Sequence, residues 1–429
     1  MTQDLPNLDQ RFAEAMGQLL GPDFPDEIGL AVSGGGDSMA MLALAHNWTR
    51  VWGVKLRVVT VDHGLRPESS DEAAMVAAEC KTLGWPHDTH KWQWTGEGNL
   101  QDQARIGRLE IFDTWRGNMR HVLVGHTRDD LAETFLMRLK RGSGVDGLSA
   151  MLARRNVVGA DGQFELLRPC LDMRRSELRH YLTVLKTPWA DDPSNDDTKY
   201  DRVKMRQLLV QLEDEGLGVD RLAETANRLR RAQEALRRRA VDVWRQVGRE
   251  GATEFGPTGD ILFDRDKLAE IERETQLRVM AAALQYVSGK GYRPRESALD
   301  SVLELALSGG HATLMGCEIR VEHQNLRIFP ELNAIQDQRL GPNQGAVWDH
   351  RWSLAAPLKD GQLIAPLGED GWQQIADKKA MPVPYHAARS LPALWEAGQL
   401  RACDPLGIGE QPTVQLYRSH SFERFLLSH

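Results

Sequence analysis

The stretch that decides the fold is AVSGGGDSMAML, residues 31–42. It places three glycines, an aspartate and two serines between an apolar stretch at 28–32, which predicts a buried strand, and a helical pattern at 39–45. A strand-to-helix turn presents free N–H groups and the positive end of the helix dipole, and both attract anions. Glycine also lets the backbone approach a bulky ligand closely. The stretch therefore predicts a phosphate-binding turn, with incidental glycines as the alternative.

Length and composition limit the architecture. At 429 residues the chain is too long for one ordinary core, so two or three domains are expected. Its 41% hydrophobic and 27% charged residues are typical of a soluble globular protein. The apolar run after the glycines is far shorter than the ~18 residues of a membrane helix, and the first ten residues lack a signal-peptide pattern. We expect a cytoplasmic protein with no membrane partner.

Charge alone does not indicate a nucleic-acid partner, because the formal net charge is −8. One segment differs: RLRRAQEALRRR, residues 228–239, contains six arginines and one glutamate. On a helix, neighbouring turns would carry a cationic surface formed by Arg230, Arg231, Arg237 and Arg238. A solvated helix face is the alternative interpretation.

Strand and helix patterns alternate along the first half of the chain. Further strands are expected at 55–62, 87–92 and 121–125, and helices at 70–84, 100–115 and 129–142. This order predicts an α/β fold with a doubly wound parallel sheet, in which ligands bind at the carboxyl ends of the strands. The polar motifs of this region come directly after the predicted strands and therefore lie at those ends.

The pattern changes near residue 216, where arginine-rich helices begin, for example at 218–245 and 273–287. Short alternating strands follow at 317–329, and the last hundred residues are rich in Pro and Gly. We expect three domains: a catalytic domain at 1–215, a mostly helical domain at 216–335 and a small α+β domain at 336–429.

The glycine turn matches one class of phosphate loop. No Walker A lysine follows the glycines, and the spacing is not G-x-G-x-x-G. Instead S-G-G-x-D-S, residues 33–38, resembles the PP-loop of ATP pyrophosphatases. That resemblance implies cleavage of ATP between its α and β phosphates, with Asp37 holding Mg²⁺. The groups expected to bind the pyrophosphate are those of Ser33, Gly34, Gly35, Gly36 and Ser38.

Further motifs narrow the class. They are VDHGLR (61–66), QARIGRLEIF (103–112), HTRDDLAET (126–134), RLKRGSGVDGLSAM (138–151), LRPCLDMRRSEL (167–178) and DDPSNDDTKYDRVKMR (191–206). Together they resemble the tRNA(Ile)-lysidine synthetase family over most of residues 25–210. Gly36 departs from the larger apolar residue usual in that family, and we expect the exchange to be tolerated.

The resemblance implies one reaction. The C2 oxygen of the wobble cytidine in an isoleucine tRNA with a CAU anticodon would be adenylated by ATP. The ε-amine of free L-lysine would then displace AMP and leave lysidine. ATP and Mg²⁺ are the implied cofactors, tRNA and lysine are the implied partners, and a homodimer is left open.

Adenylation develops negative charge on the α-phosphate, which cations stabilise. Arg105 and Arg108, three residues apart on one helical face, are candidates, with a structural surface role as the alternative. Asp62 and His63 lie at the carboxyl end of a strand and are placed for the nucleotide, although turn formation alone could explain them. His126 could contact ATP or tune a carboxylate, or it could simply cap or pack.

Lysine poses a second difficulty, because its ε-amine has a pKa near 10.4 and only ~1 molecule in 2,500 is neutral at pH 7. Carboxylates can attract the cation and accept its proton. Asp129, Asp130 and Glu133 are spaced to lie together at the start of a helix. Acidic residues in a first helical turn are also favoured by the helix dipole alone, which is the ordinary explanation.

The last of these motifs and the regions that follow it are expected to hold the tRNA. By resemblance the segment 191–206 closes over the site, with Ser194, Asn195, Arg202 and Arg206 near substrate; a simple turn is the alternative. Because a stacked base buries its reactive edge, the cytidine must be splayed into the pocket. The arginine helix and the last two domains would then bind the tRNA body and acceptor arm.

Three other functions are the alternatives. Amidotransferases of the PP-loop class commonly need a glutaminase nucleophile, and residue 2 is Thr2. A tRNA thiolase would need paired cysteines, whereas the four here are scattered: Cys80, Cys170, Cys317 and Cys403. A non-catalytic, nucleotide-regulated RNA-binding protein is the third alternative, and the acidic residues Asp37, Asp129, Asp130 and Glu133 argue against it.

Overall fold

The computed structural model describes residues 7–64, 69–94, 96–191, 201–409, 412–417 and 421–428. The chain divides into two compact units, Met1–Gln233 and Glu234–His429. The division falls within one helix, α9 (Val219–Val247). The three-domain division made from the sequence stays a prediction.

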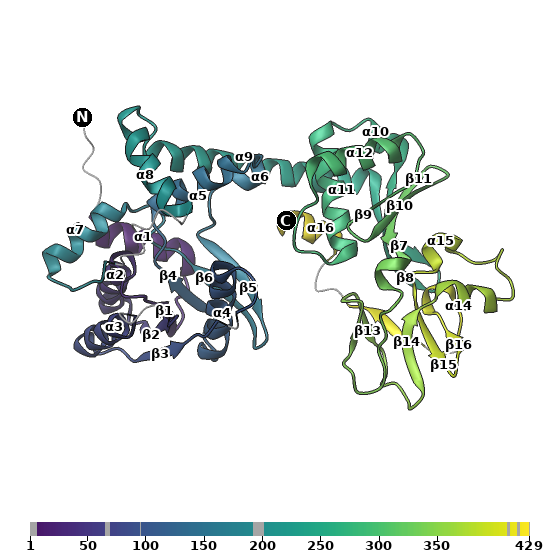
Figure 1. The fold of residues 1–429 in the computed structure, drawn as a ribbon, viewed down its shortest axis with the longest axis horizontal. Helices are drawn as coiled ribbons and strands as arrows, with labels where there is room; N and C mark the ends of the chain where they lie inside the picture. The colour runs from purple at the N-terminus through teal and green to yellow at the C-terminus, as the bar shows by residue number, and fades with distance from the viewer. Residues whose placement is uncertain are drawn as a thin grey trace. The chain divides into compact units, whose positions relative to one another are not determined.

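The first unit is built on a six-stranded sheet, and its order confirms the predicted α/β doubly wound class (Figure 1). In spatial order the strands are β3 (His87–Lys91), β2 (Lys55–Asp62), β1 (Glu27–Ala31), β4 (His121–Val124), β6 (Gly162–Leu167) and β5 (Arg154–Gly159). All neighbours pair in parallel except the hairpin β5–β6 at the edge, which the sequence analysis did not predict.

Helices cover both faces of this sheet because successive strand residues point to opposite sides. On β4, Leu123 joins one core, whereas Val122 and Val124 join the other. The first core contains α1 (Leu8–Leu20), α2 (Gly36–Trp52), α3 (Ser69–Leu83) and α7 (Arg175–Leu185). The second core contains α4 (Leu100–Trp115). The predicted strands and helices of this region are confirmed to within a few residues, except that α2 extends seven residues beyond the pattern at 39–45.

A third core lies beyond the sheet. It joins α5 (Arg128–Lys140), α8 (Asp201–Asp214) and the first part of α9. Leu131, Met205 and Ala223 are buried in it, one from each helix. This packing brings the start of α5, with its acidic residues, close to α8, with Arg202 and Arg206.

The second unit combines helices with antiparallel sheets. A five-stranded sheet has the order β7 (Gly248–Thr253), β8 (Gly256–Asp264), β11 (Asn325–Pro330), β10 (Cys317–Glu322) and β9 (Ala312–Leu314). It packs with the end of α9, α10 (Arg265–Ala269), α11 (Arg273–Ser288), α12 (Glu296–Leu307) and α16 (Phe422–Ser428). The sequence pattern predicted only the β10–β11 part of this sheet.

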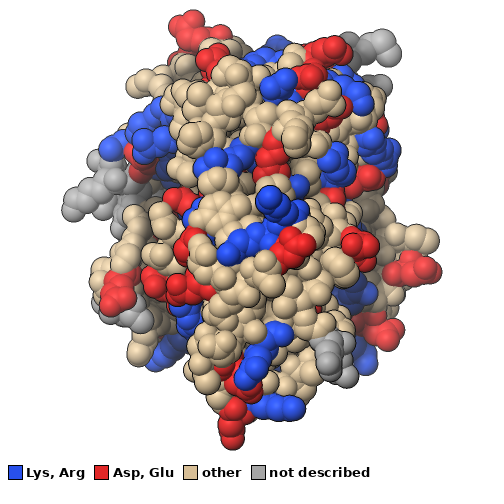
Figure 2. Space-filling model, turned by 90° about the vertical axis from the view of Figure 1, so that its right-hand side faces the viewer, with Lys and Arg blue, Asp and Glu red and all other residues tan. Residues whose placement is uncertain are grey.

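The last hundred residues form two three-stranded sheets, as the predicted small α+β region requires. One contains β12 (Val347–Trp348), β13 (Trp352–Leu354) and β17 (Val414–Leu416), and the other β14 (Gln362–Pro366), β15 (Pro392–Glu396) and β16 (Gln399–Ala402). The short helices α13 (Leu332–Ile335), α14 (Gly368–Gln374) and α15 (Tyr385–Ala388) complete it. Figure 2 shows positive and negative side chains interspersed on the face that it presents.

Within the described ranges, no helix has the length and apolar character that crossing a membrane would need.

Candidate active site

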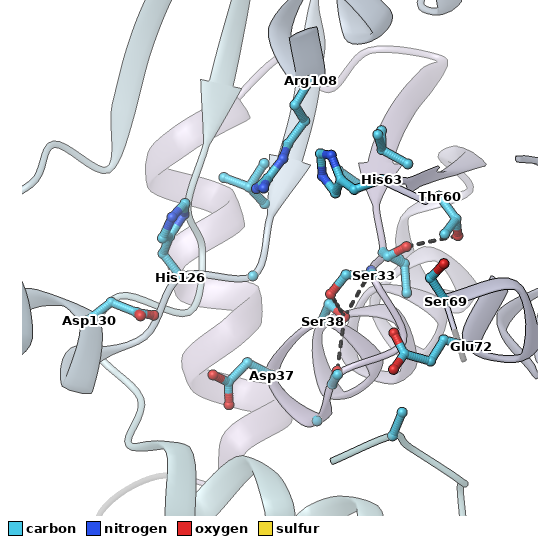
Figure 3. Close-up of a pocket in the computed structure, with 18 of the residues that line it drawn as sticks. Ser33, Asp37, Ser38, Thr60, His63, Ser69, Glu72, Arg108, His126 and Asp130 are labelled. Carbon is cyan, nitrogen blue, oxygen red and sulfur yellow. Dashed lines mark hydrogen bonds between the residues drawn. The ribbon is translucent and has the colours of Figure 1, made fainter. Parts of the chain in front are cut away.

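The glycine turn joins β1 to α2 and is shaped by its own serines (Figure 3). The Ser33 N–H donates to Ser38 Oγ over 3.1 Å, and this hydroxyl donates to the Gly35 carbonyl over 2.9 Å. Gly34 has φ +90°, a conformation that a side chain would strain. A Cβ at Gly36 would lie 3.4 Å from Trp189, which is close to ordinary contact, and the expected tolerance of glycine at that position stays a prediction. The turn is therefore preformed at the start of a helix, where anions bind.

A cavity of about 690 Å³ opens at the carboxyl ends of β1, β2 and β4, which is a typical volume for a small-molecule site. The predicted site residues that line it are Ser33, Gly35, Gly36, Asp37, Ser38, Asp62, His63, Arg108, His126, Asp130, Arg202 and Arg206. Gly34, Arg105, Asp129 and Glu133 lie outside the lining, and the four named arginines of the 228–239 segment lie on α9. Ser194 and Asn195 lie outside the described residues.

Asp37 offers a cation site. Its Oδ2 accepts a hydrogen bond from Arg175 Nε over 2.9 Å, whereas its buried Oδ1 has no partner among the residues that the structure describes. Burial raises the pKa of this carboxyl; Arg175 opposes the shift, and Asp130 and Asp129 add to it. No cluster of three or more His, Cys, Asp or Glu side chains in the described ranges could hold a metal. Mg²⁺ commonly binds through one or two carboxylates plus substrate phosphates, so Asp37 beside the phosphate loop fits this ion.

A network of arginines and carboxylates forms the next part of the site. Glu133 is fully buried and accepts from Arg175 Nη1 at 3.0 Å, Arg202 Nε at 2.6 Å and Arg206 Nε at 3.0 Å. Asp130 Oδ1 faces Arg202 Nη2 at 2.7 Å and Arg175 Nη2 at 3.4 Å. Although burial opposes ionisation, Arg202 and Arg175 hold the pKa values of both carboxyls below their usual range. Both acids are therefore ionised at neutral pH.

The acidic residues at the start of α5 also have local roles. Asp130 Oδ2 accepts from the Thr127 N–H over 2.7 Å and closes a capping box. Asp129 Oδ2 accepts from the Arg175 N–H over 2.7 Å, which fixes the start of α7. The ordinary helix-start explanation thus applies to both residues, in addition to any role in binding substrate.

Asp62 and the two histidines occupy other parts of the cavity wall. Asp62 Oδ1 accepts from Ser69 Oγ at 2.6 Å and from the Gly64 N–H at 2.9 Å; these bonds lower its pKa and hold Gly64 and Ser69 next to the end of β2. Burial, with smaller contributions from nearby arginines, lowers the pKa values of His63 and His126 to about 4. Nδ1 of each histidine is buried without a hydrogen-bond partner in the described structure. Both rings are neutral at pH 7 and have a polar atom available to a ligand.

Arg175 and Gly125 are among the lining residues that sequence reasoning did not single out. Arg175 joins Asp37 to Glu133, and its only sequence signal was its place in the motif at 167–178. Gly125, at the end of β4, packs against the start of α2: a Cβ there would lie 3.0 Å from Ser38 Cα. The glycine that ends the 121–125 strand pattern was the available signal.

Comparison with known proteins agrees with this geometry. A family model described as a PP-loop domain matches residues 8–213. A tRNA(Ile)-lysidine synthase from Ruegeria pomeroyi is 39% identical over 94% of this chain and 95% of its own length. The chain belongs to the tRNA(Ile)-lysidine synthase family. A tRNA(Ile)-lysidine synthase from Wolbachia pipientis wMel is 34% identical and covers 80% of both chains.

Among solved structures, the U34-tRNA thiolase NcsA from Methanococcus maripaludis aligns with a TM-score of 0.43 at 15% identity, over 52% of this chain and 79% of that one. The sequence relatives extend across both units of this tRNA(Ile)-lysidine synthase family member, so the resemblance inferred from the motifs is confirmed. Family membership and the PP-loop domain together support an ATP-using enzyme of tRNA modification.

Proposed function

We propose that this chain forms lysidine at the wobble cytidine of an isoleucine tRNA with a CAU anticodon, using ATP and free lysine and releasing AMP and pyrophosphate. The carrying observation is that one cavity joins the phosphate loop to the Asp130 carboxylate and its arginines, and that one Asp37 oxygen in this loop has no partner among the described residues. Activation of an oxygen by ATP needs the phosphate loop, and attack by an amine needs the Asp130 carboxylate.

In the activation half, the N–H groups of residues 34–38 bind the pyrophosphate. Mg²⁺, held through Asp37, would neutralise phosphate charge when bound. His63 and His126 offer neutral hydrogen-bonding atoms to the nucleotide, and Arg108 on the cavity wall stabilises the charge that develops on the α-phosphate. The cytidine C2 oxygen bonds to the α-phosphorus of ATP as pyrophosphate leaves, which gives an adenylated cytidine.

In the second half, the ammonium group of lysine loses a proton, the resulting amine attacks C2, and the bond from C2 to the adenylate oxygen breaks as AMP leaves. Asp130 lines the cavity and is ionised, so it can attract the ammonium group and accept this proton. Glu133 lies behind it, where Arg175, Arg202 and Arg206 surround both of its oxygens. We assign to Glu133 the role of holding these arginines in position. When one of them turns toward phosphate, Glu133 would also stabilise the incoming lysine ammonium group. Asp129 keeps the start of α7 in register with them.

The decisive experiment supplies the full-length protein with CAU-anticodon isoleucine tRNA, Mg-ATP and isotope-labelled lysine, followed by mass analysis of the nucleosides. Lysidine and one AMP per modified tRNA are expected. Methionine tRNA with the same anticodon is the matched control. AMP without labelled nucleoside would indicate another PP-loop activity, and neither product would indicate a non-catalytic RNA-binding protein. The cytoplasmic location and the homodimer stay predictions.

The arginine helix gives a separate prediction about tRNA binding. Arg231 and Arg238 are exposed on α9, and Arg238 pairs with Glu234 at 2.6 Å. Replacement of Arg230, Arg231, Arg237 and Arg238 by glutamine should weaken tRNA binding. The slope of log affinity against log salt should fall by roughly 0.7–0.9 for each phosphate that the variant no longer binds. ATP affinity should not change.

The matched control replaces Arg239 and Arg245, which pair with Glu272 and Glu423. Affinity of tRNA is measured at several salt concentrations for each variant. An unchanged slope in the fourfold variant would mean that this part of α9 is only a solvated face.

A further inference from the structure

Five arginines of the first unit gather although they come from distant segments of the chain. They are Arg105 on α4, Arg138 and Arg141 at the end of α5, Arg155 on β5 and Arg168 after β6. We call these five residues the arginine cluster. The packing of α4 on β5 and the pairing of β5 with β6 bring their segments together. Burial, and then the positive charge of Arg105, lowers the pKa values of Arg138 and Arg155; burial, then Arg155 and then Arg105, lowers the pKa of Arg168.

In the part of the chain that the structure describes, the cluster has no acidic partners, since none of its members forms an ion pair with Asp or Glu. Arg138 donates instead to the Gly147 carbonyl at 2.8 Å, and Arg168 donates to the Leu152 carbonyl at 2.7 Å. Arg154, next to Arg155 on the same strand, differs because it pairs with Glu165. An ordinary solvated surface would mix signs as Arg154 does, so this cluster has an excess of positive charge.

Arg168 is the member that points most directly to a ligand. Its side chain is only 7% exposed, and its buried Nε has no hydrogen-bond partner among the described residues. A buried cation with an unused donor is costly, because it has lost water without gaining an acceptor. A bound anion would supply both the charge and the acceptor. The pKa of Arg168 falls to about 10, chiefly because of this burial.

The position of the cluster separates it from the triphosphate. Two residues of the cavity wall lie close to the cluster. In addition to burial, the positive charge of Arg105 lowers the pKa of Arg108, and that of Arg168 lowers the pKa of His126. None of the five arginines is among the described residues that line the cavity at the phosphate loop. Because the phosphate loop already supplies N–H donors for pyrophosphate, the cluster lies where something other than the triphosphate would meet it.

We propose that the arginine cluster binds the phosphate backbone of the RNA strand whose base enters the cavity, on both sides of that base. The inference rests on the proposed function. Single-stranded RNA carries one negative charge per nucleotide, so cations spread over four segments match successive phosphates better than one small anion. A splayed base is held in an enzyme pocket only while its flanking backbone is positioned, and phosphate contacts provide that positioning without reading sequence.

The test measures binding of an anticodon stem-loop RNA to the full chain at several salt concentrations. The double variant Arg141→Gln, Arg155→Gln should bind roughly tenfold more weakly or worse, with a salt slope smaller by about 0.7 for each phosphate no longer bound. Arg154→Gln, which removes a paired arginine from the same strand, is the matched control and should keep the slope. ATP affinity should be unchanged in both variants. A double variant with Arg155→Lys in place of Arg155→Gln should regain part of the RNA affinity.

A second arm needs no protein variant. An RNA with uncharged methylphosphonates on both sides of the wobble cytidine should bind the parent protein as weakly as normal RNA binds the double variant. The two changes together should be no worse than either one, because they remove the same interactions. Additive losses, or an unchanged slope in an enzyme that still makes lysidine, would overturn the cluster assignment alone. Loss of ATP affinity in the double variant would assign the cluster to the nucleotide instead. A parent protein that makes no lysidine would overturn the proposed function itself.

Discussion

Asp37→Asn should reduce AMP formation by roughly 10²–10³-fold or more while leaving the fold intact. The variant removes the charge that would hold Mg²⁺ against the phosphates, and electrostatic stabilisation of developing charge is commonly worth that much. Burial raises the pKa of Asp37, which means that folding disfavours its ionised form. A neutral amide should therefore keep the melting temperature or increase it. Loss of activity together with retained stability would mark a residue that serves function.

The measurements are AMP release in the presence of tRNA, a thermal melt and the Mg²⁺ dependence of ATP binding. In the parent protein Mg²⁺ should strengthen ATP binding, and in Asp37→Asn this effect should nearly disappear. Asp71→Asn, on the first turn of α3, is a charge-matched control outside the cavity lining. Near-normal AMP formation with a native melt would contradict the assignment of Asp37.

Glu133→Gln should impair lysine use strongly, and Asp130→Asn should do so to a smaller extent, while nucleotide binding is affected less. Glu133 is fully buried and accepts from three guanidinium groups. A glutamine would present an N–H₂ group to these donors and leave their charge uncompensated. Removal of one partner from a buried ion pair costs about 3–5 kcal/mol. We expect less here, because the side chains of Arg202 and Arg206 are 42% and 33% exposed.

The same variants have a pH signature. Because Arg202 and Arg175 hold the pKa of Glu133 below its usual value, the ionised carboxylate stabilises the folded state above the unfolded pKa, and this contribution is lost as pH falls through the folded pKa. Glu133→Gln should therefore lower stability at neutral pH and flatten its fall in acid.

Lysine and ATP dependence of lysidine formation are measured separately, alongside urea unfolding at several pH values. If both variants keep the parental lysine dependence, the two carboxylates serve the protein scaffold or bind the metal ion that accompanies ATP. Should ATP dependence change as much as lysine dependence, the network acts on both halves of the reaction.

The sequence by itself determined the fold class and the phosphate loop. Residues 28–32 and 55–62 are apolar enough for buried strands, and the helical periods between them leave a parallel sheet as the simplest packing. The loop at 33–38 could be identified because its function depends on consecutive residues: glycine conformations, a helix start and one carboxylate. A site of this kind can be identified from a short stretch of sequence, and the family comparisons confirmed that the stretch is a PP-loop.

Only the tertiary structure decided which charges meet. The spacing of Asp130 and Glu133 predicted that they would be neighbours, but not that Arg175, from a helix more than forty residues later, would join Glu133 to Asp37. Nor did any sequence pattern show that Arg105 lies near Arg168. Hydrophobic periodicity reports which face of an element is buried, and it carries no information on which polar side chains from separate elements converge. That convergence follows from sheet order, register and helix packing, which are set by long-range contacts.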